Sequence, residues 1–149
     1  MSEESTTPHP AERVRQFVEA ANRVAANRGE LDAVPSYLAR DSVWDTSRVG
    51  IGVFEGVATI RRFLEDWFRS YEELQLVIDE LLDVGSGVVL TVTRQMARPV
   101  GTTGYIQQRE GWVWVWVDGL CASVTVYPEA VIHEARAAAE RLAQERADG

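Results

Sequence analysis

The sequence predicts an α+β fold in which helices pack on a strongly curved, mixed or antiparallel sheet. Apolar residues with helical spacing come first, whereas strand-like alternation dominates the second half of the chain. A long amphipathic helix pattern is inserted after the first strand pattern, so helices and strands are largely segregated along the chain. The 149 residues are enough for one domain, and no internal repeat or domain boundary is visible.

In the N-terminal half, residues 1–10 are expected to form a disordered tail and residues 11–149 the single domain. Residues 11–27 have an apolar stripe, including Phe17, that predicts a helix. A short helix or turn is expected around 34–38, followed by a strand over 41–47 with Trp44 on one face and Asp45 on the other. After a loop over 48–55, a third, strongly amphipathic helix begins at Gly56 and includes Trp67.

The C-terminal half reads as strands over 73–84 and 88–97, a flexible connection over 98–104 and a long hairpin over 105–127. A last helix is expected over about 128–144. The hairpin turns at Asp118-Gly119, a dipeptide that accepts the positive φ values of a type I′ turn. Counting outward from this turn pairs Trp116 with Cys121, Trp114 with Ser123 and Trp112 with Thr125.

This register gives the hairpin two unlike faces. One face is aliphatic, with Val113, Val115 and Val117 among its members. The other sets three indoles against small residues and could wall a pocket; its members are Trp112, Trp114, Trp116, Cys121, Ser123, Thr125 and Tyr127. The alternative is that the indoles pack a core or a dimer interface.

The composition indicates a globular protein with an acidic surface. Apolar residues make up 46% of the chain, the formal net charge is −8 and the pI is near 4.8. Such a surface repels phosphate backbones and anionic membranes, so neither nucleic acid nor a membrane is an expected partner. No signal peptide or membrane-spanning run is evident, which predicts a cytoplasmic protein. One cysteine and two histidines without neighbouring ligands predict no disulfide, metal or other cofactor.

Several stretches together resemble the NTF2-like superfamily, and specifically its SnoaL-like branch. They are Asp-Ser-Val-Trp-Asp at 41–45, Phe-Glu-Gly-Val-Ala-Thr-Ile-Arg-Arg-Phe at 54–63, Asp118-Gly119, and Tyr-Pro-Glu-Ala at 127–130. The resemblance implies a cone-shaped barrel, in which three helices of the N-terminal half pack on a bent sheet around a deep apolar cavity. Members include ketosteroid isomerases, scytalone dehydratase, limonene-epoxide hydrolases, polyketide cyclases and non-catalytic transport factors. Function must therefore be argued from the site.

Asp45 is the residue to which the resemblance assigns chemistry. Ketosteroid isomerases carry their general base in a Val-x-Asp strand ahead of the glycine that opens the third helix, and Val43-Trp44-Asp45 with Gly56 is similar. Beside an apolar cavity, desolvation would raise the pKa of Asp45, which suits proton abstraction. The alternative is that Asp45 caps a turn or pairs with Arg48.

Other positions depart from the isomerase pattern. The tyrosine that donates to the oxyanion corresponds to Phe17, which has no donor, and the acidic companion corresponds to Trp114. One indole N–H cannot replace two short donors, so ketosteroid isomerase activity is not expected. The Asp-Arg-Asp set of the hydrolases is not found. Arg94 and Arg109 are candidate electrophilic partners, with surface salt bridges as the alternative.

The resemblance also directs the indole face of the hairpin into the cavity and the valine face outward. The expected ligand-binding residues are Phe17, Trp44, Trp67, Arg94, Trp112, Trp114, Trp116, Ser123, Thr125 and Tyr127. An exposed valine stripe is unusual in a monomer, so a homodimer through the outer face of the sheet is expected.

Two functions of different classes follow. The first is a metal-free isomerase, cyclase, lyase or hydrolase that acts by acid–base chemistry on a small hydrophobic compound, aromatic or polycyclic, with Asp45 as general base. The second is a non-catalytic ligand-binding or dimerisation module. A cavity of a few hundred Å³ that opens onto Asp45 would favour the first function.

Overall fold

The N-terminal half contains two α-helices in the computed structural model, which describes residues 9–27 and 29–149. Helix α1 (Pro10–Ala25) starts at a proline, whose fixed φ suits a first helical turn. The expected short second helix is a pair of 3₁₀ turns, η1 (Leu31–Ala33) and η2 (Pro35–Tyr37). Helix α2 (Val57–Arg69) is the strongly amphipathic one. The predicted tail lies outside the described residues, apart from its last two.

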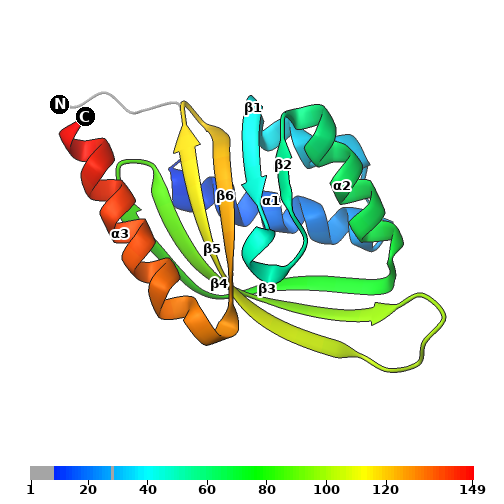
Figure 1. Cartoon of the computed structure of the whole chain (residues 1–149). Helices are drawn as coiled ribbons and strands as arrows, with labels where there is room; N and C mark the ends of the chain where they lie inside the picture. The colour runs from blue at the N-terminus through cyan, green and yellow to red at the C-terminus, as the bar shows by residue number, and fades with distance from the viewer. Residues whose placement is uncertain (1–8, 28) are drawn as a thin grey trace.

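Six strands form one curled, mixed sheet in the order β2-β1-β6-β5-β4-β3. Their bounds are β1 (Leu38–Asp45), β2 (Val53–Glu55), β3 (Tyr71–Gly85), β4 (Val88–Pro99), β5 (Ile106–Val117) and β6 (Leu120–Pro128). Neighbouring strands run antiparallel, except that β1 and β6 are parallel. The sheet does not close, since β2 and β3 form its two edges (Figure 1). The predicted α+β class is confirmed, while β2 lies in a segment for which the sequence predicts a loop.

Helices cover both faces of this sheet (Figure 1). On the concave face, α1 and α2 enclose the larger core together with the indoles of β5. On the convex face lies α3 (Ile132–Asp148), which follows the turn η4 (Glu129–Val131). Its alanines pack against Val113 and Val115, which are only 3% and 6% exposed. None of the helices that the structure describes is long and apolar enough to cross a membrane.

The expectation of an exposed valine stripe is therefore wrong for Val113 and Val115, because α3 of the same chain covers them, whereas Val117 beside the hairpin turn is 42% exposed. The approach is close: a Cβ built on Gly111 would lie 2.9 Å from the Cβ of Ala135. A homodimer stays a prediction, but the exposed stripe can no longer be the reason for it.

The β5–β6 hairpin turns at Asp118-Gly119 as predicted, and both residues have positive φ, 52° and 83°. Trp116 also pairs with Cys121 as predicted. Beyond that pair the predicted register is wrong by one residue, because a β-bulge places an extra residue of β6 between Cys121 and Ser123. A one-residue shift moves side chains to the other face of the sheet. The residues that pair with Trp114 and Trp112 are consequently Val124 and Val126.

Candidate functional site

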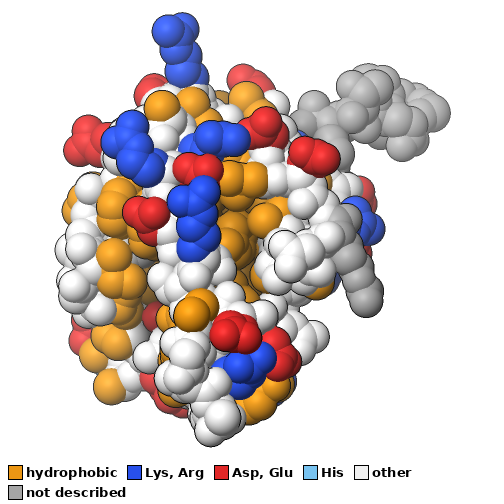
Figure 2. All heavy atoms as spheres, turned by 90° about the vertical axis from the view of Figure 1, so that its right-hand side faces the viewer, with side chains coloured by type: hydrophobic (Ala, Val, Ile, Leu, Met, Phe, Trp, Pro, Cys, Tyr) orange, Lys and Arg blue, Asp and Glu red, His pale blue; other side chains and the backbone are white. Residues whose placement is uncertain are grey.

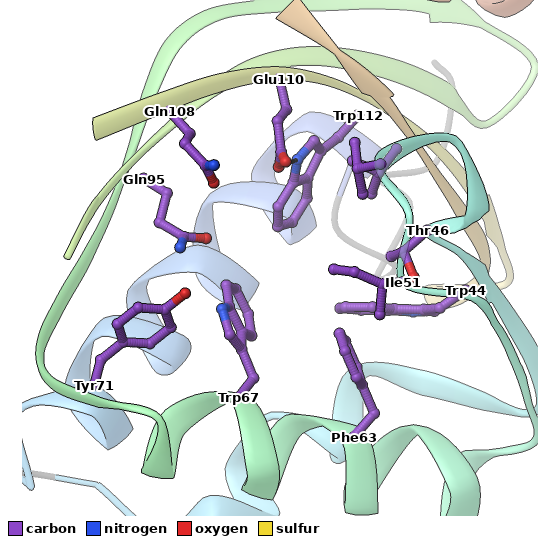
Figure 3. Close-up of a pocket in the computed structure, with 12 residues that line it drawn as sticks. Trp44, Thr46, Ile51, Phe63, Trp67, Tyr71, Gln95, Gln108, Glu110 and Trp112 are labelled. Atoms are coloured by element: carbon purple, nitrogen blue, oxygen red, sulfur yellow. Dashed lines mark hydrogen bonds between the residues drawn. The ribbon is translucent and has the colours of Figure 1, made fainter. Parts of the chain in front are cut away.

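A pocket of about 110 Å³ lies between α2, the loop after β1 and the concave face of β3–β5 (Figure 3). Its lining combines apolar walls with a polar side: Trp44, Thr46, Val49, Ile51, Phe63, Trp67, Tyr71, Gln95, Gln108, Glu110, Trp112 and Val126. Figure 2 looks onto the side that carries α2, where apolar side chains gather in a hollow with charged side chains around it.

The aromatic walls come from three separate elements. Phe63 and Trp67 are four residues apart on α2, which puts them one above the other on the same helix face, with ring planes within 11° of each other. Trp44 is a concave-face residue of β1, and its ring centroid lies 6.3 Å from that of Trp112 on β5. Trp112 and Trp67 lie on opposite sides of the hollow (Figure 3).

Glu110 brings a carboxyl group into this lining, the only one from the part of the chain that the structure describes. It lies two residues before Trp112 on β5, so strand alternation places both side chains on the concave face. The indole Nε1 of Trp112 donates a hydrogen bond of 3.0 Å to Glu110 Oε1. Desolvation raises the pKa of Glu110, and this hydrogen bond opposes the rise only in part. A carboxyl group whose pKa is raised in this way is a stronger base when ionised than an exposed carboxyl group.

Two amides and a phenol complete the polar side. Gln95 on β4 and Gln108 on β5 are cross-strand partners, and both point into the pocket (Figure 3). Gln95 is only 8% exposed, and the side-chain hydrogen bonds of its described neighbours on this face, Thr91 with Thr93, Trp114 with Thr91 and Trp112 with Glu110, do not involve its amide. Tyr71, at the start of β3, turns its hydroxyl toward the same space (Figure 3). Polar side chains that face a partly open apolar pocket are suited to hold a ligand.

A wider hollow of about 360 Å³ adjoins the pocket. The two share Val49, Gln108 and Glu110, and the outer one also reaches Arg109 and Glu129. Glu110 thus lies where a compact inner pocket meets a larger outer space.

The deep end of the cone, where a cavity was expected, is filled by the chain itself. Phe17 of α1 packs edge-on against Trp114, with ring centroids 5.3 Å apart, and Trp114 stacks with Trp116. The Trp114 N–H is already used, since it donates a 3.0 Å bond to the hydroxyl of Thr91. Phe17, Trp114 and Trp116 are therefore core residues in this structure and do not line the pocket.

The expected place of Asp45 beside the cavity is contradicted. Asp45 ends β1 on the opposite face from Trp44 and is absent from the pocket lining. It accepts hydrogen bonds from the hydroxyl and backbone N–H of Ser47 and pairs with Arg48 at 3.2 Å. The Ser47 bonds, helped by Arg48, lower the pKa of Asp45 instead of raising it. The turn-capping alternative is the one observed.

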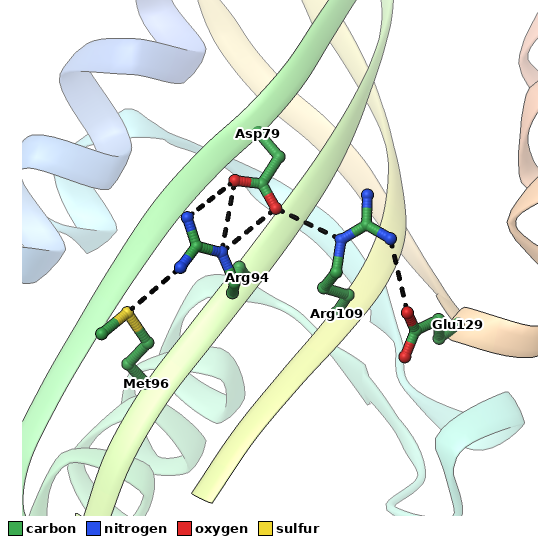
Figure 4. A network of polar contacts seen from close by, with 5 residues as sticks. All are labelled: Asp79, Arg94, Met96, Arg109 and Glu129. Atoms are coloured by element: carbon green, nitrogen blue, oxygen red, sulfur yellow. Dashed lines mark hydrogen bonds and ion pairs between the residues drawn. The ribbon is translucent and has the colours of Figure 1, made fainter.

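Arg94 also faces away from the pocket, since it follows the convex-face residues Val88 and Leu90 at even spacing on β4. Its guanidinium pairs with Asp79 at 3.0 Å, and Asp79 in turn binds Arg109, which reaches Glu129 (Figure 4). The expected ligand contact of Arg94 is replaced by the salt-bridge alternative.

Three further predicted ligand residues lie on the convex side because of the bulge in β6. Ser123 and Thr125 alternate with the concave residues Val124 and Val126, and Tyr127 packs in the core beneath α3. The guanidinium of Arg48 lies 4.7 Å from the centroid of the Tyr127 ring. Of the predicted ligand-binding set, the structure brings Trp44, Trp67 and Trp112 together at the pocket.

Several pocket residues were not predicted from the sequence, and a local sequence pattern indicates only some of them. Glu110 could have been found, because its spacing from Trp112 is that of one strand face. Gln95 and Tyr71 carry no local signal, since the pairing of β3 with β4 and the curl of the sheet bring them here. Cys121 is a buried residue, and desolvation raises the pKa of its thiol. No group of three metal-ligating side chains occurs in residues 9–27 and 29–149.

Comparisons with known proteins identify the family to which this domain belongs. A family model described as a SnoaL-like domain matches residues 14–124. No curated protein has a sequence that matches this chain.

Solved structures match over most of the chain. One is a hypothetical protein with a ketosteroid isomerase-like fold from Catenulispora acidiphila in complex with trimethylamine. It is 15% identical in sequence, the match covers 82% of this chain and 86% of that chain, and the TM-score is 0.68. An LEH-like epoxide hydrolase of M. tuberculosis is 17% identical, with 89% of this chain and 88% of that chain covered and a TM-score of 0.68. A protein from Shewanella denitrificans described as a SnoaL-like polyketide cyclase is 12% identical, with 84% of this chain and 93% of that chain covered and a TM-score of 0.67.

Proposed function

The chain belongs to the SnoaL-like domain family, and from this premise we propose that its pocket binds a compact organic molecule on which Glu110 acts as general acid or base. The observation that carries the proposal is the position of the Glu110 carboxyl group, which faces an aromatic pocket and has its pKa raised by desolvation. The proposal keeps acid–base chemistry for this chain but moves it from Asp45 to Glu110.

The size of the pocket limits the substrate. A dry cavity of roughly 150 Å³ holds one benzene molecule, whereas the inner pocket measures about 110 Å³. A polycyclic compound does not fit there, so the reacting part of the substrate has only a few heavy atoms. Any larger substituent would extend into the outer hollow beyond Glu110.

The polar side of the pocket supports binding of a substrate with at least one polar group. The amide of Gln95 offers a donor and an acceptor, and the hydroxyl of Tyr71 offers both functions as well. The neighbours named as an epoxide hydrolase or crystallised with trimethylamine share the fold alone at their identities. The ligand of this chain is therefore inferred from its own lining residues.

A second candidate is a binding module that uses the same pocket without catalysis. It is favoured by the absence of another carboxyl group or any basic side chain in the pocket lining of the described structure. General acid–base catalysis by Glu110 alone is nevertheless sufficient for a reaction that needs one proton removed.

The experiment uses nitroethane, a molecule of a few heavy atoms that becomes a nitronate when a base removes one α-proton, and a panel of compact neutral compounds followed by tryptophan fluorescence. In Glu110→Gln, the rate should fall by about 10²–10⁴-fold, while neutral compounds still bind. Asp45→Asn, which removes a carboxylate outside the pocket, should leave both readouts unchanged.

Each outcome decides between the candidates. Equal proton-abstraction rates in the unmodified chain and in Glu110→Gln, with binding retained, would leave the binding module as the better function. Failure of every compound to bind would reject the pocket as a ligand site.

A further inference from the structure

The charge balance of the pocket carries one more inference, which rests on the proposed function of the same site. Among the residues that the structure describes, Glu110 is the only one of the pocket lining with a formal charge, because that lining contains no lysine, arginine, histidine or aspartate and no second glutamate. Its hydrogen bond within the pocket comes from the indole of Trp112, which is neutral. An ionised Glu110 therefore lacks a cationic partner in the pocket.

This situation differs from that of the other carboxylates with shifted pKa values. Asp45 pairs with Arg48, and Asp79 pairs with two arginines (Figure 4). Charged groups that are removed from water are normally paired, since their desolvation is costly otherwise. Glu110 is the exception, and it faces a cavity rather than a protein cation.

The walls of that cavity are suited to a cation. Aromatic rings attract positive charge through the negative potential over their faces, and clusters of aromatic side chains bind quaternary ammonium groups. Here the indoles of Trp44, Trp67 and Trp112 and the phenol of Tyr71 surround the space from four elements (Figure 3). The formal net charge of −8 also favours the approach of a cation over that of an anion.

We infer that the ligand of this pocket carries a compact organic cation, an alkylated ammonium group, which enters the aromatic enclosure and serves as the counter-ion of Glu110. A trimethylammonium group has four carbon and nitrogen atoms without its substituent, which is in keeping with a volume of about 110 Å³. The substituent of the cation would point past Glu110 into the outer hollow.

The test compares choline with 3,3-dimethylbutan-1-ol, which has the same shape but a carbon atom in place of the nitrogen. Binding is measured by calorimetry and by the indole NMR signals. Choline should bind about tenfold more tightly or better, as expected for cation–π contacts aided by a carboxylate. Glu110→Gln should remove that preference and leave the affinity for the alcohol nearly unchanged. Asp45→Asn removes the same charge outside the pocket and should preserve the preference.

Equal or tighter binding of the alcohol would overturn the inference and leave the proposed function in place, because a neutral ligand would still occupy the pocket. A preference for choline that survives in Glu110→Gln would overturn the counter-ion role. If neither compound binds and the panel of compact neutral compounds also fails, the proposed function falls together with this inference.

Discussion

The indole N–H of Trp112 points back along β5 to the carboxylate of Glu110, two residues earlier, at 3.0 Å. The two side chains form one unit on the concave face of the sheet, with the indole as a wall of the pocket and the carboxylate as its polar edge. Because the indole N–H is a neutral donor, it orients Glu110 without neutralising its charge. The pairing keeps the carboxyl group in a position where its protonation state can respond to a ligand.

The first prediction concerns the pH dependence of stability. The folded chain holds the Glu110 proton more tightly than the unfolded chain, since desolvation raises the pKa of this carboxyl group. The Glu110 contribution to stability should therefore be greatest below the unfolded pKa, about 4.3, and decline as pH rises through the folded pKa. In Glu110→Gln this decline should disappear, and the variant should gain stability relative to the unmodified chain at neutral pH.

Denaturant unfolding at a series of pH values measures this slope, and the Trp112 indole NMR signal reports the Glu110 titration directly. An indole signal that titrates below the ordinary range of glutamate would contradict the raised pKa.

Asp45 should behave in the opposite way. Its pKa is lowered by the Ser47 hydrogen bonds, so its contribution is complete above the unfolded pKa of about 3.9 and is lost as pH falls through the folded value. Asp45→Ala, which removes both acceptor oxygens, should cost about 0.5–2 kcal/mol at neutral pH, as for other side chains that cap turns and helix starts. The difference from the unmodified chain should shrink in acid. A variant that loses ligand binding but not stability would show that Asp45 belongs to the site after all.

Thr91 gives a third prediction, because its hydroxyl accepts the N–H of the fully buried Trp114. Thr91→Val keeps the shape but leaves that N–H without an acceptor, which should cost about 1–3 kcal/mol. Thr125→Val is the matched control on the other face of the sheet and should change stability by less than about 0.5 kcal/mol. Urea denaturation measures both variants. Similar values for the two would mean that the Trp114 N–H finds another partner.

Much of the fold could be predicted from the sequence, because the periodic patterns agree with the final burial of each element. The hairpin register could not, although its turn could. Near the turn, the backbone N–H of Trp116 bonds to the carbonyl of Gly87 in the β3–β4 turn, at 2.8 Å. This contact with a distant segment accompanies the bulge in β6, and counting along the hairpin alone does not include it.

The site was harder to predict than the fold for a related reason. The helix and strand patterns of the sequence predict Trp67 and Trp112 as pocket residues. The other lining residues include residues of β3 and β4, whose position beside these two tryptophans depends on the curl of the whole sheet. The predicted position of Asp45 is wrong because that prediction follows the family resemblance, whereas the residues next to Asp45 indicate a turn. Its neighbours Ser47 and Arg48 offer the turn hydrogen bonds that it makes.

The covering of the valine face by α3 leads to a last prediction, at the point where helix and sheet approach most closely. Ala135 packs over Gly111, and a Cβ at position 111 would lie 2.9 Å from the Ala135 Cβ, so Gly111→Ala should force α3 outward. Overpacking of this kind costs about 1–3 kcal/mol. In Gly104→Ala, a control in the β4–β5 connection, the new Cβ meets no atom within 4 Å, so stability should hardly change. Amide exchange should speed up in α3 of Gly111→Ala while α1 and the pocket keep their protection. If both variants unfold at the same urea concentration, α3 does not hold this face as tightly as its packing indicates.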